Sequence, residues 1–313
     1  MDTITQAFYD QRFQVLFFVE KKAGAFQDFF AAIMERRYPA DFQRVRPWGS
    51  AGDWKNDGYL RSKRMLFQCY APNEMEADKC LSKIEEDFLG ALPYWRDHFD
   101  VWVFVHNSRE GLGPQVTKRL LELDAAHAPL RTTSWGFTEL HMETFQLSEH
   151  DLGAVLGPAP SRESMVNLGM ADLQPLLAQL QELPAVSEPD LRPVPSSKLA
   201  YNMLSDAVGH LLRAGMTRAP LVRKFFELQG VHTRRDRIAE AFKAKYQDLR
   251  AAGLGPNLIF HELHKFASGD LLPDPQRQSA TLAVLAFLFE DCEIFERPPD
   301  DETGSEAPSG ATL

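Results

Sequence analysis

"GDWKNDGYLRSKRMLFQCYAP", residues 52–72, contains the pattern that decides the fold of the N-terminal half of the chain. The segments DGYL and RMLFQCYAP read as two strands, and the polar segment RSKR joins them in a short turn. Asp57 precedes the first strand, and Gln68 and Tyr70 are two residues apart on the second. Because side chains alternate between the faces of a strand, Gln68 and Tyr70 are expected on one face and Cys69 on the other.

Helical and strand patterns surround this hairpin in an order typical of an α/β domain. Apolar residues at steps of three and four over residues 25–38 predict an amphipathic helix, which Pro39 ends. The order of helix, three strands, helix, strand, helix, strand predicts a mixed sheet flanked by helices. The remaining strands are expected at FQRVRPWG (42–49), DVWVFVHN (100–107) and SWGFTEL (134–140), and the remaining helices at 77–92 and 114–127.

The C-terminal half shows no strand pattern. Five helical segments follow one another, and each of the first four ends at a glycine, which predicts a compact all-α domain. They are residues 196–215, 219–230, 234–253, 255–269 and 274–295, and the last is the most apolar. The predicted organisation is an α/β domain over 1–150, a Pro/Ser-rich linker with one short helix over 151–197, the helical domain over 198–297, and a disordered tail over 298–313.

Composition and charge argue against a membrane protein, a secreted protein and a protein with a uniformly basic surface. No apolar run reaches the roughly 18 residues that span a bilayer, and no secretion signal opens the chain. Three cysteines without paired spacing are typical of the reducing cytoplasm. The net charge of −10 argues against a uniformly basic surface that coats nucleic acid, but it leaves room for a local basic cleft. We therefore expect a cytoplasmic protein without a membrane partner.

Hydrolysis of a phosphodiester with Mg²⁺ requires oxygen ligands held close together and a cation nearby. One arrangement places an aspartate at a strand start and, on the neighbouring strand, an acid or amide two residues before a lysine. The run RVRPWG, the motif NDGYL and the strand LFQCYAP, followed by a helix and an apolar strand, resemble this arrangement. Residues 15–145 thus resemble the restriction-endonuclease-like fold of the PD-(D/E)XK superfamily.

The resemblance implies roles for particular residues. Asp57 matches the metal-binding aspartate and Gln68 the acid-or-amide position, while Tyr70 stands where the lysine belongs. A phenol carries no charge at pH 7 and cannot offset developing phosphate charge as an ammonium does. The replacement cation could be Lys55, or alternatively Lys63, Lys21 or Lys22, and Glu20 could add a third metal-binding carboxylate.

A possible phosphate-facing ridge precedes the hairpin. Arg44, Arg46 and Trp48 alternate along the expected strand 42–49, with Trp48 placed to stack on a base. Lys63, in the turn between the two strands, is a further candidate contact to nucleic acid. The alternative is an ordinary strand with solvated arginines and a core tryptophan.

The helical segments carry a second resemblance. KLAYNMLSDAVGHLLRAGM, LVRKFFE and RDRIAEAFKAKYQDLRAAGLGPNLIFHELHKFASG resemble the C-terminal domain of proteins in prokaryotic ABC-three-component conflict systems, some of them related to the Lamassu type. This resemblance implies an SMC-like ABC ATPase and a small middle component as partners, and a third protein with an effector at its N-terminus.

The two resemblances together lead to one expected function and two alternatives. The expected protein is an antiviral or anti-plasmid defence subunit, with a nuclease-like domain that binds DNA or cleaves it with Mg²⁺. The first alternative is a non-catalytic adaptor that keeps an inactive nuclease fold. The second alternative is a stand-alone restriction-type nuclease.

Overall fold

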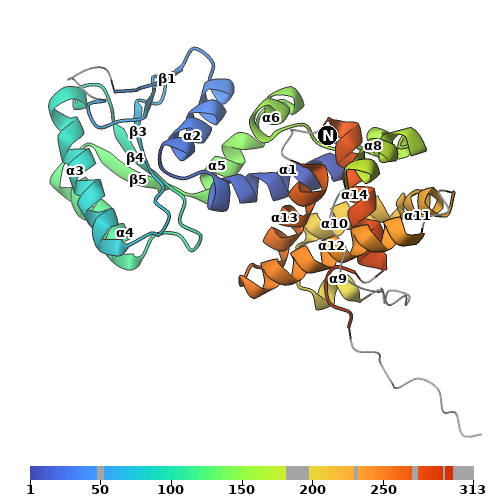
Figure 1. Ribbon diagram of the computed structural model, residues 1–313. Helices are drawn as coiled ribbons and strands as arrows, with labels where there is room; N and C mark the ends of the chain where they lie inside the picture. The colour runs from blue at the N-terminus through green and yellow to red at the C-terminus, as the bar shows by residue number, and fades with distance from the viewer. Residues whose placement is uncertain (48–52, 181–196, 229–231, 270–273, 292, 299–313) are drawn as a thin grey trace, which may run out of the picture. The chain divides into compact units, whose positions relative to one another are not determined.

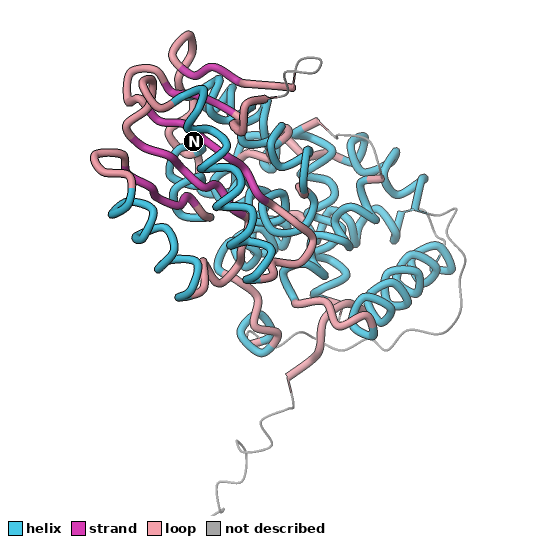
Figure 2. Tube along the Cα trace, turned by 90° about the vertical axis from the view of Figure 1, so that its left-hand side faces the viewer, coloured by secondary structure: helices cyan, strands magenta, loops and turns pink. Residues whose placement is uncertain are grey.

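The computed structural model describes residues 1–47, 53–180, 197–228, 232–269, 274–291 and 293–298, with only the backbone for 232–234. Two compact units make up the chain (Figure 1). The first contains Met1 and Tyr9–Ala159, and the second contains Asp2–Phe8 and Pro160–Leu313. In the described residues all strands belong to the first unit (Figure 2). The predicted class, an α/β domain followed by an all-α domain, is confirmed.

Five strands form one mixed sheet with β3 at its centre. The strand order is β1-β2-β3-β4-β5, in which β1, β2 and β3 pair antiparallel, and β3, β4 and β5 pair parallel. Helical crossovers make the two parallel pairs possible. The strands are β1 (Phe42–Arg44), β2 (Gly58–Leu60), β3 (Met65–Tyr70), β4 (Val101–His106) and β5 (Arg131–Trp135).

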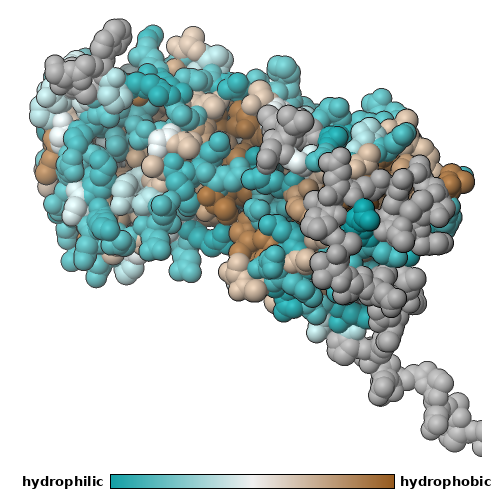
Figure 3. Space-filling view, viewed as in Figure 1, coloured by the Kyte–Doolittle hydropathy of each residue, from teal (hydrophilic) through white to brown (hydrophobic). Residues whose placement is uncertain are grey.

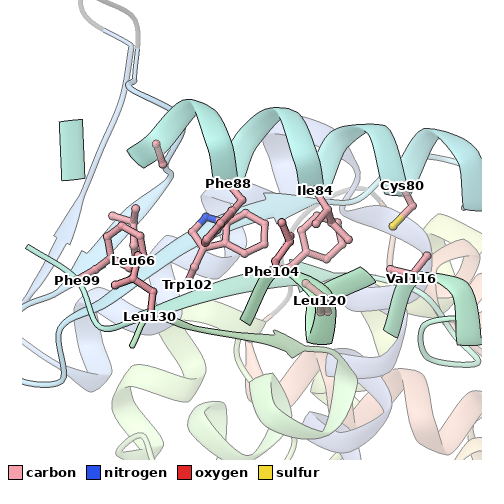
Figure 4. Packing of buried hydrophobic residues seen from close by; sticks show 12 residues of the cluster. Leu66, Cys80, Ile84, Phe88, Phe99, Trp102, Phe104, Val116, Leu120 and Leu130 are labelled. Carbon is pink, nitrogen blue, oxygen red and sulfur yellow. The ribbon is translucent and has the colours of Figure 1, made fainter. Parts of the chain in front are cut away.

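Helices cover both faces of the sheet. On one face, α3 (Ala77–Trp95) and α4 (Pro114–Ala126) enclose a buried cluster with Phe88 of α3 against Trp102 of β4, 5.6 Å between ring centroids (Figure 4). On the other face, α2 (Ala23–Arg37) places Phe30 5.3 Å from Phe67 of β3. The surface of α3 and α4 in view is largely hydrophilic (Figure 3), as expected for helices with one apolar stripe.

The remaining helices of the first unit are short or were not predicted. α1 (Thr3–Val15) supplies residues to both units and continues into a π-helical turn, η1 (Leu16–Glu20). Its apolar pattern is interrupted by polar residues, and the sequence did not reveal it. α5 (Phe137–Thr144) and α6 (Glu149–Leu156) complete the unit.

Three predicted elements have different bounds in the structure. The strand expected at 42–49 ends at Arg44, shortly before Pro47, which has no N–H to donate. The strand expected at 134–140 is β5, Arg131–Trp135, and α5 follows because Glu139 accepts a hydrogen bond from the N–H of Gly136 at 2.8 Å. The helix expected at 196–215 is two helices, which the left-handed backbone of Met203 (φ +51°) separates.

The second unit packs around α14 (Pro275–Glu290), whose residues from Gln278 to Phe289 are all buried. The prediction that this apolar helix is the core of the helical domain is confirmed. Other helices of the unit surround it: α7 (Arg162–Val166), α8 (Met170–Leu180), α10 (Asp206–Met216), α11 (Ala219–Leu228) and α13 (Pro256–Ser268) contact α14, and α9 (Lys198–Tyr201) and α12 (His232–Ala251) complete the unit.

The contacts of α14 include a backbone approach and a buried cation. A Cβ on Gly215 of α10 would lie 2.3 Å from the carbonyl oxygen of Leu282, so only glycine fits there. Lys198 is fully buried and donates to the carbonyl oxygens of Phe289 and Ile294 at 2.7 and 2.8 Å. An ammonium is favourable there because the last carbonyls of a helix carry partial negative charge.

The structure divides the chain at Ala159 and Pro160, whereas the sequence suggested a first boundary at residue 150. α7 and α8 lie in the segment predicted as a linker, yet both pack on α14 in the helical unit. The rest of that segment, 181–196, and residues 299–313 of the predicted tail lie outside the described residues.

Candidate functional site

Asp57 lies directly before β2, where that strand stops pairing with β3. Its N–H donates to the carbonyl oxygen of Phe67 at 2.8 Å, and its Oδ2 accepts from the N–H of Cys69 at 2.7 Å. The residue is only 8% exposed. The carboxylate therefore accepts the hydrogen bond from the Cys69 N–H that a neighbouring strand would otherwise accept. The backbone of Asp57 is also fixed, because its N–H is bonded to Phe67.

The loop before Asp57 has an unusual backbone. Trp54 and Lys55 both have positive φ angles, +50° and +60°, a region that bulky residues rarely occupy. Asp53 Oδ1 accepts from the N–H of Lys55, and the buried Asn56 donates from Nδ2 to the carbonyl oxygen of Asp53, both at 2.9 Å. These two hydrogen bonds hold the loop in its strained form.

Gln68 and Tyr70 share one face of β3, as predicted from alternation. This is the face of Leu66, which packs in the cluster under α3 and α4. Gln68 is 5% exposed, and its Oε1 has no hydrogen-bond partner. Tyr70 is partly exposed, and its ring lies 5.9 Å from the ring of Phe104.

The sequence missed the ion pairs that form around the buried Asp87 of α3. Asp87 is fully buried and accepts from Lys83 Nζ at 2.9 Å, and Lys55 Nζ lies 3.5 Å from the same carboxylate. Lys55 also forms an ion pair with Glu86. A signal was present, because Asp87 stands within the apolar stripe of Cys80, Ile84, Phe88 and Ala91. A charged residue in such a stripe is buried with a partner.

Burial dominates the electrostatics of the two aspartates. It raises the pKa of Asp57 to about 7, and the charges of Asp53 and Asp87 add to the rise, while the Cys69 N–H and Lys83 oppose it. Burial likewise raises the pKa of Asp87, against the opposing effect of Lys83 and Lys55. Since the charges of Asp87 and Lys83 on α3 change the pKa of Asp57, these three residues form one electrostatic group.

A surface pocket of about 310 Å³ adjoins this group. It is lined by Tyr70, Asp78, Lys79, Ser82, Lys83 and Glu86. Tyr70, Lys83 and Glu86 belong to the strand and helix already described. The pocket therefore gives solvent access beside the position at which the nuclease-like pattern expects a lysine.

Three buried oxygens near this part of the sequence are of the types that hard cations bind, and they lack hydrogen-bond partners. Gln68 Oε1 and Asp87 Oδ2 are buried oxygens without a hydrogen-bond partner, and Asn56 Oδ1 is a third. Buried acceptors without partners are unfavourable, and Mg²⁺ or Ca²⁺ takes carboxylate and amide oxygens. In the part of the chain that the structure describes, no three Asp, Glu, His or Cys side chains form a metal-binding group. A cation here would depend on amide oxygens as well as on carboxylates.

The remaining predicted residues have other partners. Glu20, predicted as a third metal ligand, forms an ion pair with Arg12 at 2.9 Å. Arg44 and Arg46 both bind the carboxylate of Asp28 on α2. Lys63 donates to the hydroxyl of Tyr38 at 3.1 Å, and Trp48 lies outside the described residues.

Comparison with known proteins identifies the helical unit. Residues 171–296 match the family model described as C-terminal domain 10 of the ABC-three component (ABC-3C) systems. This match supports membership of the chain in an ABC-three component system. The matched ABC-3C domain starts in α8, within the segment predicted as a linker, and it contains the buried helix α14.

The other two comparisons add no relative of this chain. No curated protein matches its sequence significantly, and neither does any solved structure. Within the described residues, no helix is both long enough and apolar enough to cross a membrane.

Proposed function

We propose that this ABC-3C chain is the effector-type third component of a prokaryotic antiviral or anti-plasmid defence system. Its helical unit would dock to the SMC-like ABC ATPase or to the small middle component, and the nucleotide state of the ATPase would control access to DNA. The support is the ABC-3C domain over residues 171–296, together with the partners that the family resemblance implies.

For the α/β unit we propose a restriction-endonuclease-like, Mg²⁺-dependent phosphodiesterase site. The observation that carries this proposal is the pair of buried oxygens without hydrogen-bond partners, Gln68 Oε1 and Asp87 Oδ2, of which the Asp87 carboxylate also acts on the pKa of Asp57. An amide oxygen and two carboxylates suit the ligand preference of Mg²⁺. Asp87, from α3, would take the role that the sequence gave to Glu20.

Each residue of the group has a distinct part in this proposal. Asp57, Asp87 and Gln68 would hold Mg²⁺, which when bound supplies positive charge to polarise the phosphate. The ammonium of Lys83 would offset developing negative charge, which Tyr70 cannot do. Lys55 would orient Asp87 through their 3.5 Å contact. In the reaction, water adds to phosphorus and one P–O ester bond breaks, leaving a phosphomonoester and a hydroxyl group.

A non-catalytic adaptor is the second candidate. It is favoured by Tyr70 at the lysine position and by the ion pairs that already engage Lys55 and Lys83 with Glu86 and Asp87. In that case the α/β unit would join partner subunits or position their substrate. The third possibility, a stand-alone nuclease, does not account for the ABC-3C domain, and an adjacent SMC-like ATPase gene would argue against it.

The test is a cleavage assay on the chain purified with the products of its neighbouring genes. Wild type should cleave DNA or RNA only with Mg²⁺ and lose activity with a chelator. Asp57→Ala and Lys83→Met should each lower the rate by 10-fold to 100-fold or more. Lys118→Met, at an exposed lysine of α4, is the matched control.

The outcomes separate the candidates. Cleavage that survives Asp57→Ala removes the catalytic assignment. Equal inactivity of wild type and variant in the full complex, with the complex itself intact, supports the adaptor.

A further inference from the structure

An exposed aromatic stack includes Trp54, which lies three residues before Asp57 in the same loop. The rings of Trp54 and Tyr94 are nearly parallel, with an interplanar angle of 4° and centroids 5.1 Å apart. Trp54 is 44% exposed and Tyr94 is 52% exposed. The first comes from the loop before β2 and the second from the last turn of α3. We name this pair the aromatic platform.

Two further aromatic residues, Trp95 and Tyr59, pack behind the platform. Trp95 meets Trp54 edge-on at 6.3 Å, and Tyr59 of β2 lies 5.9 Å from Trp95. The hydroxyl of Tyr59 donates to the carbonyl oxygen of His98 at 2.5 Å. The rings of Trp95 and Tyr59 therefore connect the platform to the sheet, while the rings of Trp54 and Tyr94 stay partly exposed to solvent.

The backbone at Trp54 is strained, and burial does not offset the strain. Trp54 has φ +50°, in the left-handed region that a bulky residue rarely occupies. Core packing usually compensates for such strain, but almost half of the Trp54 surface faces water. The hydrogen bonds of Asp53 with Lys55 and Asn56 keep the loop in this form. Strain that keeps an aromatic ring exposed is typical of a binding residue.

We propose that the aromatic platform stacks an unpaired base of single-stranded nucleic acid. This inference rests on the proposed function and assigns its substrate class. Flat, exposed and fixed aromatic rings are the surface on which bases of any sequence stack. Trp54 is three residues from Asp57, at most about 10 Å along the chain. A single strand stacked on the platform can therefore reach the phosphodiesterase site with its backbone, whereas a base inside a duplex is not free to stack.

The experiment measures binding of labelled oligothymidylate, and of a duplex that contains it, to the full-length chain in the presence of a chelator. Trp54→Ala should weaken single-strand binding at least tenfold, as expected for the loss of one stacking contact. Tyr94→Ala should weaken it in the same direction, and Trp54→Phe should retain most of it. The matched control is Leu89→Ala, at a residue that is also exposed on α3.

The Tyr94→Ala variant keeps the test valid if Trp54→Ala disturbs the folding of its loop. Tyr94 stands in regular helix, so Tyr94→Ala leaves the strained loop sequence intact. The proposal is overturned if neither alanine variant weakens single-strand binding, if wild type does not bind the single strand, or if both variants weaken duplex binding equally.

Measuring cleavage and oligothymidylate binding on the same variants distinguishes failure of the platform proposal from failure of the proposed phosphodiesterase function. If Asp57→Ala abolishes cleavage while Trp54→Ala and Tyr94→Ala bind normally, the site stands and the platform does not act on substrate. If the platform variants instead prevent association with neighbouring gene products while oligothymidylate binding stays unchanged, the platform docks a protein and the inference is wrong.

Discussion

At the residue scale, the environment of Asp57 differs from what its sequence context suggests. A carboxylate at the start of a strand is usually solvated, but this one is buried against the backbone of β3. The raised pKa of about 7 follows mainly from that burial. Its protonation therefore changes near neutral pH, in the range where a bound cation would compete with the proton.

Replacing Asp57 with asparagine should change how stability depends on pH. The unfolded carboxyl titrates near 3.9, so between about pH 4 and pH 7 the folded state holds a proton that the unfolded state releases. The free energy of unfolding of the wild type should fall across this window, by on the order of 4 kcal/mol. Asp57→Asn removes this contribution and should become the more stable protein as pH rises.

Urea unfolding monitored by tryptophan fluorescence suits this measurement, because all five tryptophans lie in the N-terminal half of the chain. At pH 8, added Mg²⁺ should stabilise wild type more than Asp57→Asn. Parallel pH profiles for the two proteins would contradict the assigned burial of the carboxylate, and equal Mg²⁺ effects would contradict the cation site.

At the scale of elements, the contact between α10 and α14 depends on a missing side chain. The backbone of Gly215 approaches the carbonyl of Leu282 so closely that a Cβ would overlap it at 2.3 Å and meet the Cβ of Ala286 at 2.8 Å. Backbone atoms inside a packed helix cannot move aside as the end of a flexible side chain can.

Gly215→Ala should therefore destabilise the helical unit by about 1–3 kcal/mol or more, the usual range for overpacking. The control is Gly209→Ala in the same helix, where the nearest atom is the end of the Arg213 side chain at 3.4 Å. That change should be neutral or stabilising, because alanine favours helix by about 1 kcal/mol over glycine. Hydrogen exchange of α14 amides measures both, and similar exchange in the two variants would refute the close approach.

The helices and strands also differ in how well the sequence predicts them. The amphipathic helix over 25–38, the strands β2 and β3, and the apolar helix α14 follow from local periodicity and are present in the structure. α1 was missed because its faces are less clearly divided. α5 was read as strand because the aromatic and β-branched residues of SWGFTEL favour strand, and the cap between Gly136 and Glu139 decided otherwise.

At the scale of the whole molecule, the first residues of the chain belong to the C-terminal unit. Thr5 is buried and donates from Oγ1 to the carbonyl oxygen of Pro160 at 3.0 Å. The N–H of Arg162 donates to Asp2 Oδ2 at 2.8 Å. These contacts close the helical unit across more than 150 positions of sequence.

Asp2→Ala combined with Thr5→Val should therefore destabilise the helical unit by about 1–3 kcal/mol, because the buried carbonyl of Pro160 loses its donor and the N–H of Arg162 loses its acceptor. Amide exchange should increase in α7 and α14, with little change in β3–β5. Asp10→Ala is the control, since its carboxylate meets His141 Nε2 at 3.1 Å within the α/β unit. Increased exchange confined to the sheet in the double variant would show that these residues serve the first unit instead.

The sequence by itself determined the types and order of most elements and the class of both domains, because periodicity and turn residues act over a few neighbouring positions. It also predicted that Asp57 directly precedes one strand and that Gln68 and Tyr70 stand on the next, as the structure has them. Only the tertiary structure decided that Asp87 pairs with Lys83 and with Lys55, the lysine that the sequence suggested as the replacement cation, and that Glu20 pairs with Arg12. The reason is physical: burial, pKa and ion pairing depend on which surfaces pack together, and those surfaces are far apart in the sequence.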